Sequence, residues 1–181
     1  MTELERVRVN KFATLVDDLF GILDGAMLTN RLKDMGYFKT PASVSHHGNY
    51  NGGLFDHSWA VMEALENLTY KLDLKWERKE SLYIVGLLHD LCKCNSYIYN
   101  KETGQWEYNN DITINGHGEL SVILAQQLIQ LTEEEMLCIR WHMGAYDNKE
   151  NWNILGRAIE EYPNVLYTHT ADMIATRIRG I

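Results

Sequence analysis

Apolar residues recur at helical spacing along most of the chain. Between Leu4 and Leu23 they fall on one face of a helix, as three- and four-residue spacing requires. The same spacing predicts further helices over residues 27–35, 53–72, 77–93, 151–161 and 164–179. Gly36 and Pro163 stand where a helix should stop. The pattern therefore predicts a mostly helical protein.

Two further helix starts and one break in the helical pattern complete this prediction. Thr132 and Glu135 have the spacing of a capping box, and Gly116-His117 stands where another helix should begin. Residues 37–51 contain Pro41 and Gly48 and are expected to form a loop. Residues 96–100 and 105–109 are rich in aromatic side chains and flank a Gly-containing connection, which predicts a β-hairpin. The expected fold class is all-α with one small β-hairpin.

Composition and charge narrow the function classes. The 181 residues include 17 Lys and Arg against 25 Asp and Glu, a net charge of −8, which argues against a broad grip on a long nucleic acid. The three cysteines lack CxxC spacing, so we expect a reducing interior. The first residues form no apolar signal segment, and the run Leu82–Leu88 is too short to span a bilayer. We expect a cytoplasmic protein of one domain that acts away from membranes.

Seven histidines in an acidic chain are its most unusual feature. Five positions stand out in order: His57, the pair His89-Asp90, His117, His142 and Asp172, with gaps of 32, 27, 25 and 30 residues. Each gap fits one helix and one connection, so a bundle would bring these groups to a common point. There they would form a metal site, since imidazole and carboxylate together bind divalent transition metals. On spacing alone, histidines packed in the core explain the positions equally well.

The ordered set of these residues resembles a known family. Gly52–His57, Leu87–Lys93 and Ala171-Asp172 resemble the H…HD…D signature of the HD-domain metal-dependent phosphohydrolases, and His117 and His142 resemble the extra histidines of its dinuclear members. The stretch 41–47, followed by Gly52-Gly53, is similar to the lead-in of bacterial HD-type 3′-to-5′ exoribonucleases. The resemblance implies an HD-domain helical bundle, with N-terminal helices over 1–36 and a metal-binding core over 41–177. In a chain of 181 residues we expect no separate nucleic-acid-binding domain.

The resemblance also implies a ligand set. His57, His89, Asp90 and Asp172 would hold one metal, and Asp90 would bridge to a second held by His117 and His142. The cofactors would be two divalent transition metals: iron, manganese, cobalt, nickel or zinc. Met143 stands where the HD-GYP phosphodiesterases have a further histidine, so neither a third metal nor cyclic-di-GMP cleavage is expected.

The implied reaction is hydrolysis of a nucleotide or related phosphate ester by metal-activated hydroxide. Asp90 and Lys93 are the expected catalytic residues, because Lys93 shares a helical face with His89 and Asp90; a solvated lysine at a helix end is the alternative. Lys93, His46 and His47 are the expected substrate-binding residues, although loop histidines can equally be surface residues. His169 is expected to orient a metal ligand, and Arg140 to lie on a solvated face.

Two other functions remain open on the sequence. The mixed-valent di-iron oxygenases of the HD superfamily carry the same order of ligands, and a binding module could keep the fold without catalysis. The expected partner is a small phosphorylated substrate, most simply a nucleotide. The oligomeric state and the native metal are not fixed by the sequence.

Overall fold

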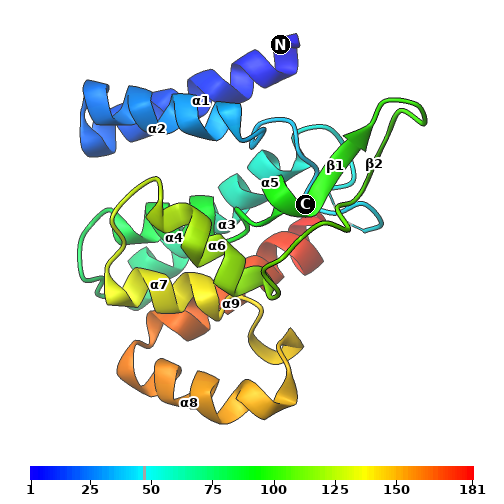
Figure 1. Cartoon of the computed structure of the whole chain (residues 1–181). Coiled ribbons are helices and arrows are strands. Elements are labelled where there is room, and N and C mark those ends of the chain that lie inside the picture. Colours follow the sequence, from blue (N-terminus) through cyan, green and yellow to red (C-terminus); the bar gives the residue numbers. More distant parts are fainter. Residues whose placement is uncertain (47) are drawn as a thin grey trace. The chain divides into compact units, whose positions relative to one another are not determined.

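The computed structural model describes residues 1–46 and 48–181 and has an all-α fold with one two-stranded sheet (Figure 1). The elements run in the order α1 (Glu3–Phe20), α2 (Ile22–Asp34), α3 (Gly53–Leu72), α4 (Ser81–Leu88), α5 (Lys93–Ser96), β1 (Tyr97–Asn100), β2 (Gln105–Tyr108), α6 (His117–Gln126), α7 (Glu133–Arg140), the 3₁₀ turns η1 (Gly144–Tyr146) and η2 (Lys149–Asn151), α8 (Trp152–Glu161), α9 (Asn164–Met173) and the π-helical segment η3 (Ile174–Arg179). The predicted fold class is therefore confirmed.

The chain divides into two compact units, and each is built from two segments of sequence. The first unit contains Met1–Asp56 and Lys93–Ile112, and the second contains His57–Cys92 and Thr113–Ile181. The prediction of a single domain over 1–181 stays a prediction. No helix in the described part of the chain is long and apolar enough to cross a membrane.

The first unit is organised around a cluster of aromatic rings. Helices α1 and α2 lie side by side (Figure 1), and Phe12 of α1 is fully buried. Its ring meets Tyr37 and Phe38 edge-on, with centroids 6.2 and 5.6 Å away, and Phe55 packs against both of these rings. Burial of such large rings contributes much of the apolar stabilisation of a unit this size.

The hairpin of the first unit has the predicted position. Strands β1 and β2 pair antiparallel, with Tyr97 opposite Tyr108 and Tyr99 opposite Trp106. Each pair makes an edge-to-face ring contact, with centroids 5.4 and 5.5 Å apart. Cross-strand aromatic pairs of this kind stabilise a short hairpin, which explains why the aromatic-rich sequence departs from the helical pattern.

In the second unit, helix α7 lies at the centre of the helix contacts. Helix α7 packs against α4, α6 and α9, and α8 packs against α9. Thr132 and Glu135 form the predicted capping box at the start of α7, and the carboxylate of Glu135 also accepts hydrogen bonds from Arg78 and Ser81. Because Glu135 is fully buried, these bonds compensate its loss of water and fix the start of α7 against the residues before α4.

The predicted bounds of the helix over residues 77–93 were wrong at both ends. Helix α4 begins at Ser81 and ends at Leu88, and the chain turns over His89–Cys92 before Lys93 begins the separate α5. Two contacts explain the C-terminal end. The ring of His89 bonds to the carbonyl of Gly86, and the amide of Leu91 donates to the carbonyl of Leu88, only three residues back. The shared helical face that linked Lys93 to Asp90 therefore does not exist.

Candidate metal centre

Three of the expected ligands converge in the interior of the second unit. One nitrogen each of His57 and His89 and a carboxylate oxygen of Asp90 all lie within 4.8 Å of one another. The Nε2 atoms of the two histidines are 3.2 Å apart, and Oδ2 of Asp90 lies 3.7 Å from that of His57 and 3.8 Å from that of His89. All three residues are buried. This is a cluster of soft nitrogen and hard oxygen donors withdrawn from water.

Two further residues expected as ligands border this cluster. Oδ1 of Asp172, at the end of α9, lies 3.3 Å from Nε2 of His57. Nε2 of His142, which follows α7, lies 3.5 Å from Oδ1 of Asp90. The five residues come from four separate stretches of helix or helix end, as the spacing of the sequence suggested.

Each of the three buried histidines is oriented by a backbone carbonyl. The Nδ1 atom lies 3.0 Å from the oxygen of Ile181 for His57, 2.9 Å from that of Gly86 for His89 and 2.7 Å from that of Ile139 for His142. A carbonyl only accepts hydrogen bonds, so Nδ1 carries the proton in each ring and Nε2 is the atom presented to the cluster. This orientation is the usual arrangement of metal-binding histidines.

The environment of His142 supports a cation at this point. Its side chain is 1% exposed, and its Nε2 has no hydrogen-bond partner among the described residues. A buried nitrogen without a partner is costly, and a metal that accepts its lone pair would remove that cost. The donor set of imidazoles and carboxylates thus fits a divalent transition metal.

Burial and the nearby carboxylates shift the pKa values of the three clustered histidines in different directions. Burial lowers the pKa of His89 to about 4 and outweighs the nearby carboxylate of Asp90. Burial also acts to lower the pKa of His57, but the hydrogen bond with Asp172 and the charges of both carboxylates outweigh it and raise that pKa. For His142, burial is likewise outweighed by Asp90, and the pKa is raised. In the absence of metal, the shifts favour protons on His57 and His142, opposite the carboxylates, and a neutral His89.

His117 differs from the other three histidines. It is the first residue of α6, as predicted, and its side chain is exposed. Its Nδ1 lies 3.4 Å from Sγ of Cys92, which in turn lies 4.0 Å from Oδ1 of Asp90. His117 is therefore brought to the edge of the cluster, with the thiol of Cys92 between it and the carboxylate.

Lys93 and His46 belong to the first unit by their contacts. Lys93 belongs to the first unit, where its Nζ is 5.7 Å from the centre of the Tyr97 ring. His46 is an exposed residue of the first unit whose Nδ1 lies 2.8 Å from the hydroxyl of Ser45. His47 lies outside the described residues. Their roles in catalysis or substrate binding stay predictions.

The structure shows the contacts of three residues beside the cluster. His169 donates from Nδ1 to the backbone carbonyl of His142, at 2.8 Å, so it holds the backbone and not the ring of that residue. The fully buried Cys92 contacts His117, a pairing that the sequence pattern does not indicate. The expectation for Arg140 was wrong. Instead of facing solvent, it pairs with Glu119 and Asp147 at 2.6 and 2.7 Å, because its guanidinium stacks over Trp141 and turns towards both carboxylates.

Comparison with known proteins agrees with this arrangement of histidine and aspartate. The model of the HD domain family matches residues 54–175, about two thirds of the chain. The protein belongs to the HD domain family. The matched segment begins before His57 and ends after Asp172, so it encloses the cluster. Members of the family are generally metal-dependent phosphohydrolases that bind divalent metals. No curated protein and no solved structure matched the chain.

Proposed function

We propose that this HD-domain protein is a metal-dependent phosphohydrolase that cleaves a nucleotide or a related phosphate ester. One observation carries the proposal. Three buried imidazoles have Nδ1 fixed on backbone carbonyls, and their Nε2 atoms face the carboxylates of Asp90 and Asp172. A purely structural core has no need for such an array, because burying three imidazoles and two carboxylates together is costly.

We further propose a dinuclear centre. His57, His89, Asp90 and Asp172 would hold one metal, and Asp90, His117 and His142 would hold the other. The two oxygens of Asp90 support this division, since Oδ2 faces His57 and His89 whereas Oδ1 faces His142. A divalent metal bound there supplies Lewis acidity, which lowers the pKa of water and polarises a phosphoryl oxygen.

The protein's own residues would prepare the site for this chemistry. The backbone carbonyls fix the tautomers of the histidines, so no ring has to rotate when substrate arrives. Asp90 and Asp172 concentrate negative charge opposite the rings, which selects for cations. A catalytic role for Lys93 and substrate contacts for His46 and His47 stay part of the proposal, on the strength of their places beside the ligand motifs in the sequence.

The substrate side of the proposal is a small phosphorylated molecule. The net charge of −8 supports this over a long nucleic acid, because local metal charge suffices for one phosphate but not for a long backbone. The similarity of residues 41–53 to HD-type exoribonucleases favours a nucleotide. A cytoplasmic location follows from the cysteine pattern and remains part of the proposal.

The decisive experiment is a metal-by-substrate screen with the full chain. Nucleoside mono- and triphosphates, dinucleotides and cyclic nucleotides are tested with manganese, iron, cobalt and nickel, and bound metal is quantified in parallel. We expect anaerobic hydrolysis of at least one nucleotide, abolished by Asp90→Ala. Turnover that requires both iron and oxygen would instead identify a di-iron oxygenase. Metal binding without any turnover would identify a binding module.

A further inference from the structure

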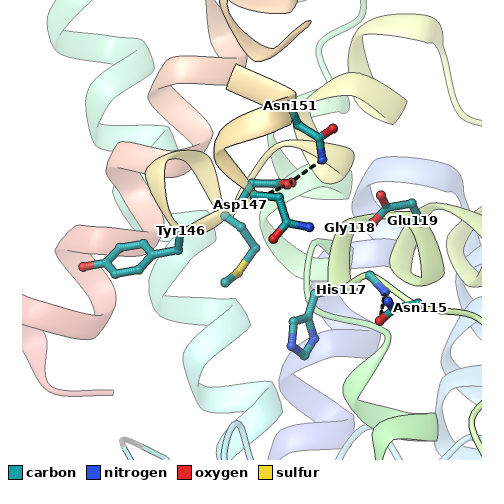
Figure 2. A pocket seen from close by; sticks show the side chains of 10 residues that line it. Asn115, His117, Gly118, Glu119, Tyr146, Asp147 and Asn151 are labelled. Carbon is teal, nitrogen blue, oxygen red and sulfur yellow. Dashed lines mark hydrogen bonds between the residues drawn. The ribbon is translucent and has the colours of Figure 1, made fainter. Parts of the chain in front are cut away.

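A polar cavity of about 230 Å³ opens at the start of α6 in the second unit. Its lining residues come from the first turn of α6 with the two residues before it, and from the segment that contains η1 and η2. The polar side chains among them are Asn115, His117, Glu119, Asp147, Asn148 and Asn151. Figure 2 shows Asn115, His117 and Glu119 on one side, with Asp147 and Asn151 on the other.

The cavity lies beside the candidate metal centre. His117 lines it and is joined to Asp90 through the thiol of Cys92, by contacts of 3.4 and 4.0 Å. Met143, the neighbour of His142, also lines it. A phosphate ester with its phosphoryl group at the cluster would therefore extend its remaining part into this cavity.

The charge of the cavity disfavours a second phosphate. Glu119 and Asp147 both pair with Arg140, and Oδ1 of Asp147 also accepts hydrogen bonds from the backbone N–H of Asn148 and the amide of Asn151. No Lys or Arg occurs among the described residues that line the cavity. Glu119 also folds back against Gly116, at the start of α6, so a carboxylate already faces the helix N-terminus that would otherwise attract an anion. The walls thus present carboxylate and amide groups with an excess of negative charge.

We propose that this cavity binds the neutral nucleoside part of the substrate. Carboxylate oxygens accept hydrogen bonds from sugar hydroxyls or base amino groups, and the amides of Asn115, Asn148 and Asn151 both donate and accept. The volume lies below the roughly 300–1,000 Å³ of pockets for drug-sized ligands, so the cavity holds one nucleoside at most and cannot enclose two. The inference rests on the proposed function and narrows its substrate to nucleoside phosphates with a single nucleoside.

Binding is tested first without turnover. The four common ribonucleosides are titrated into the full chain loaded with diamagnetic zinc while the amide signals of Gly116 and Gly118 are followed by NMR. We expect at least one nucleoside to shift both signals, and Asn148→Ala to weaken that binding about three- to tenfold, as loss of one hydrogen bond predicts. Asn148 is exposed, so its replacement should not affect folding. Asn153→Ala, an exposed amide of α8 outside the cavity, is the matched control and should bind like wild type.

Different results would contradict the nucleoside site and the proposed function. If no nucleoside shifts the two signals, or if Asn148→Ala and Asn153→Ala bind the nucleoside equally, the cavity is not a nucleoside site. Nucleoside binding in a protein that hydrolyses no phosphate ester would uphold the cavity's ligand and overturn only the proposed function.

With an active enzyme, the ratio of KM for a nucleoside monophosphate to KM for p-nitrophenyl phosphate gives a second readout. We expect Asn148→Ala to raise this ratio about three- to tenfold, because only the nucleotide carries a nucleoside. An unchanged ratio would contradict the assignment even if hydrolysis itself is confirmed.

Discussion

The Nε2 atoms of His57 and His89 lie 3.2 Å apart, and both rings are buried with Nδ1 on a backbone carbonyl. In their neutral forms both Nε2 atoms carry lone pairs, and two facing lone pairs repel each other. A positive charge near them relieves this repulsion. The hydrogen bond with Asp172 and the charges of Asp90 and Asp172 raise the pKa of His57, which favours a proton on this ring when metal is absent. A divalent metal would take the place of that proton.

Metal should therefore stabilise the fold through this pair. At 100 times its dissociation constant, a metal that binds only the folded state adds about 2.7 kcal/mol, or roughly 5–10 °C in Tm. We expect manganese, cobalt or nickel to raise the Tm by this order relative to protein in EDTA, and His57→Ala to abolish the shift. His46→Ala, an exposed histidine, should keep it. An equal shift in His57→Ala would place the metal elsewhere.

The number of metals depends on His117. If the centre is dinuclear, wild-type protein should bind about two metal ions per chain and His117→Ala about one, since the buried ligands remain. Metal analysis by mass spectrometry after gel filtration measures this directly. About one metal in wild type, with His117→Ala and His142→Ala still loaded, would establish a mononuclear site.

Cys92 should act as a positioning residue for His117. Its thiol holds Nδ1 of His117, where the three buried histidines have a carbonyl instead. Removing such an outer partner typically lowers metal affinity 10- to 100-fold. We expect Cys92→Ala to weaken the more loosely held metal by about tenfold, and Cys92→Ser to restore part of the affinity because a hydroxyl can replace the contact. Cys94→Ala is the control; if Cys92→Ala binds both metals like Cys94→Ala, the thiol has no such role.

Much of this architecture was predictable because it depends on local patterns. Helix α3 has the predicted bounds, the capping box of Thr132 and Glu135 is present, and the aromatic hairpin lies where it was expected. Helix spacing also brought His57, His89 and Asp90 together in one prediction, because each lies on or directly after a long apolar helix.

The remaining features depend on contacts that no local pattern contains. The end of α4 is set by the ring of His89 turning back to Gly86, so periodicity alone extended the helix too far. Arg140 is placed by Glu119 and Asp147, which are distant in sequence or lie beyond a turn. The contact of Cys92 with His117 likewise joins residues 25 positions apart. Such pairings follow from packing and not from periodicity.

The metal-free protein should lose stability in acid through Asp172. Burial alone would raise the pKa of Asp172, but the hydrogen bond with His57 and the nearby imidazoles lower it to about 2. In the unfolded chain the pKa is about 3.9. The lowered pKa contributes stability that is present above pH 4 and lost as the pH falls towards 2, by about 2 kcal/mol.

This contribution can be isolated by substitution. In EDTA, Asp172→Asn should lower the free energy of unfolding near pH 6 by about 2 kcal/mol and flatten its dependence between pH 4 and 2. Urea unfolding at a series of pH values measures both effects. The exposed Asp111→Asn should leave the curve unchanged. If the free energy of unfolding of Asp172→Asn depends on pH as it does in wild type, other groups cause the loss of stability in acid.

Gly86 should be sensitive to substitution, because it serves two contacts at once. A methyl group on Gly86 would lie 2.5 Å from Cα of Met62 in α3, so the backbones of α3 and α4 approach closely here. The carbonyl of Gly86 also accepts the bond from the His89 ring. We expect Gly86→Ala to lower the free energy of unfolding by about 1–3 kcal/mol, as overpacking does, and to weaken metal binding.

Gly156→Ala in α8 is the control, since its methyl group meets no atom within 4 Å. It should instead raise stability by about 0.5–1 kcal/mol in urea unfolding. If both variants raise stability equally, the close approach of α3 and α4 does not exist in solution.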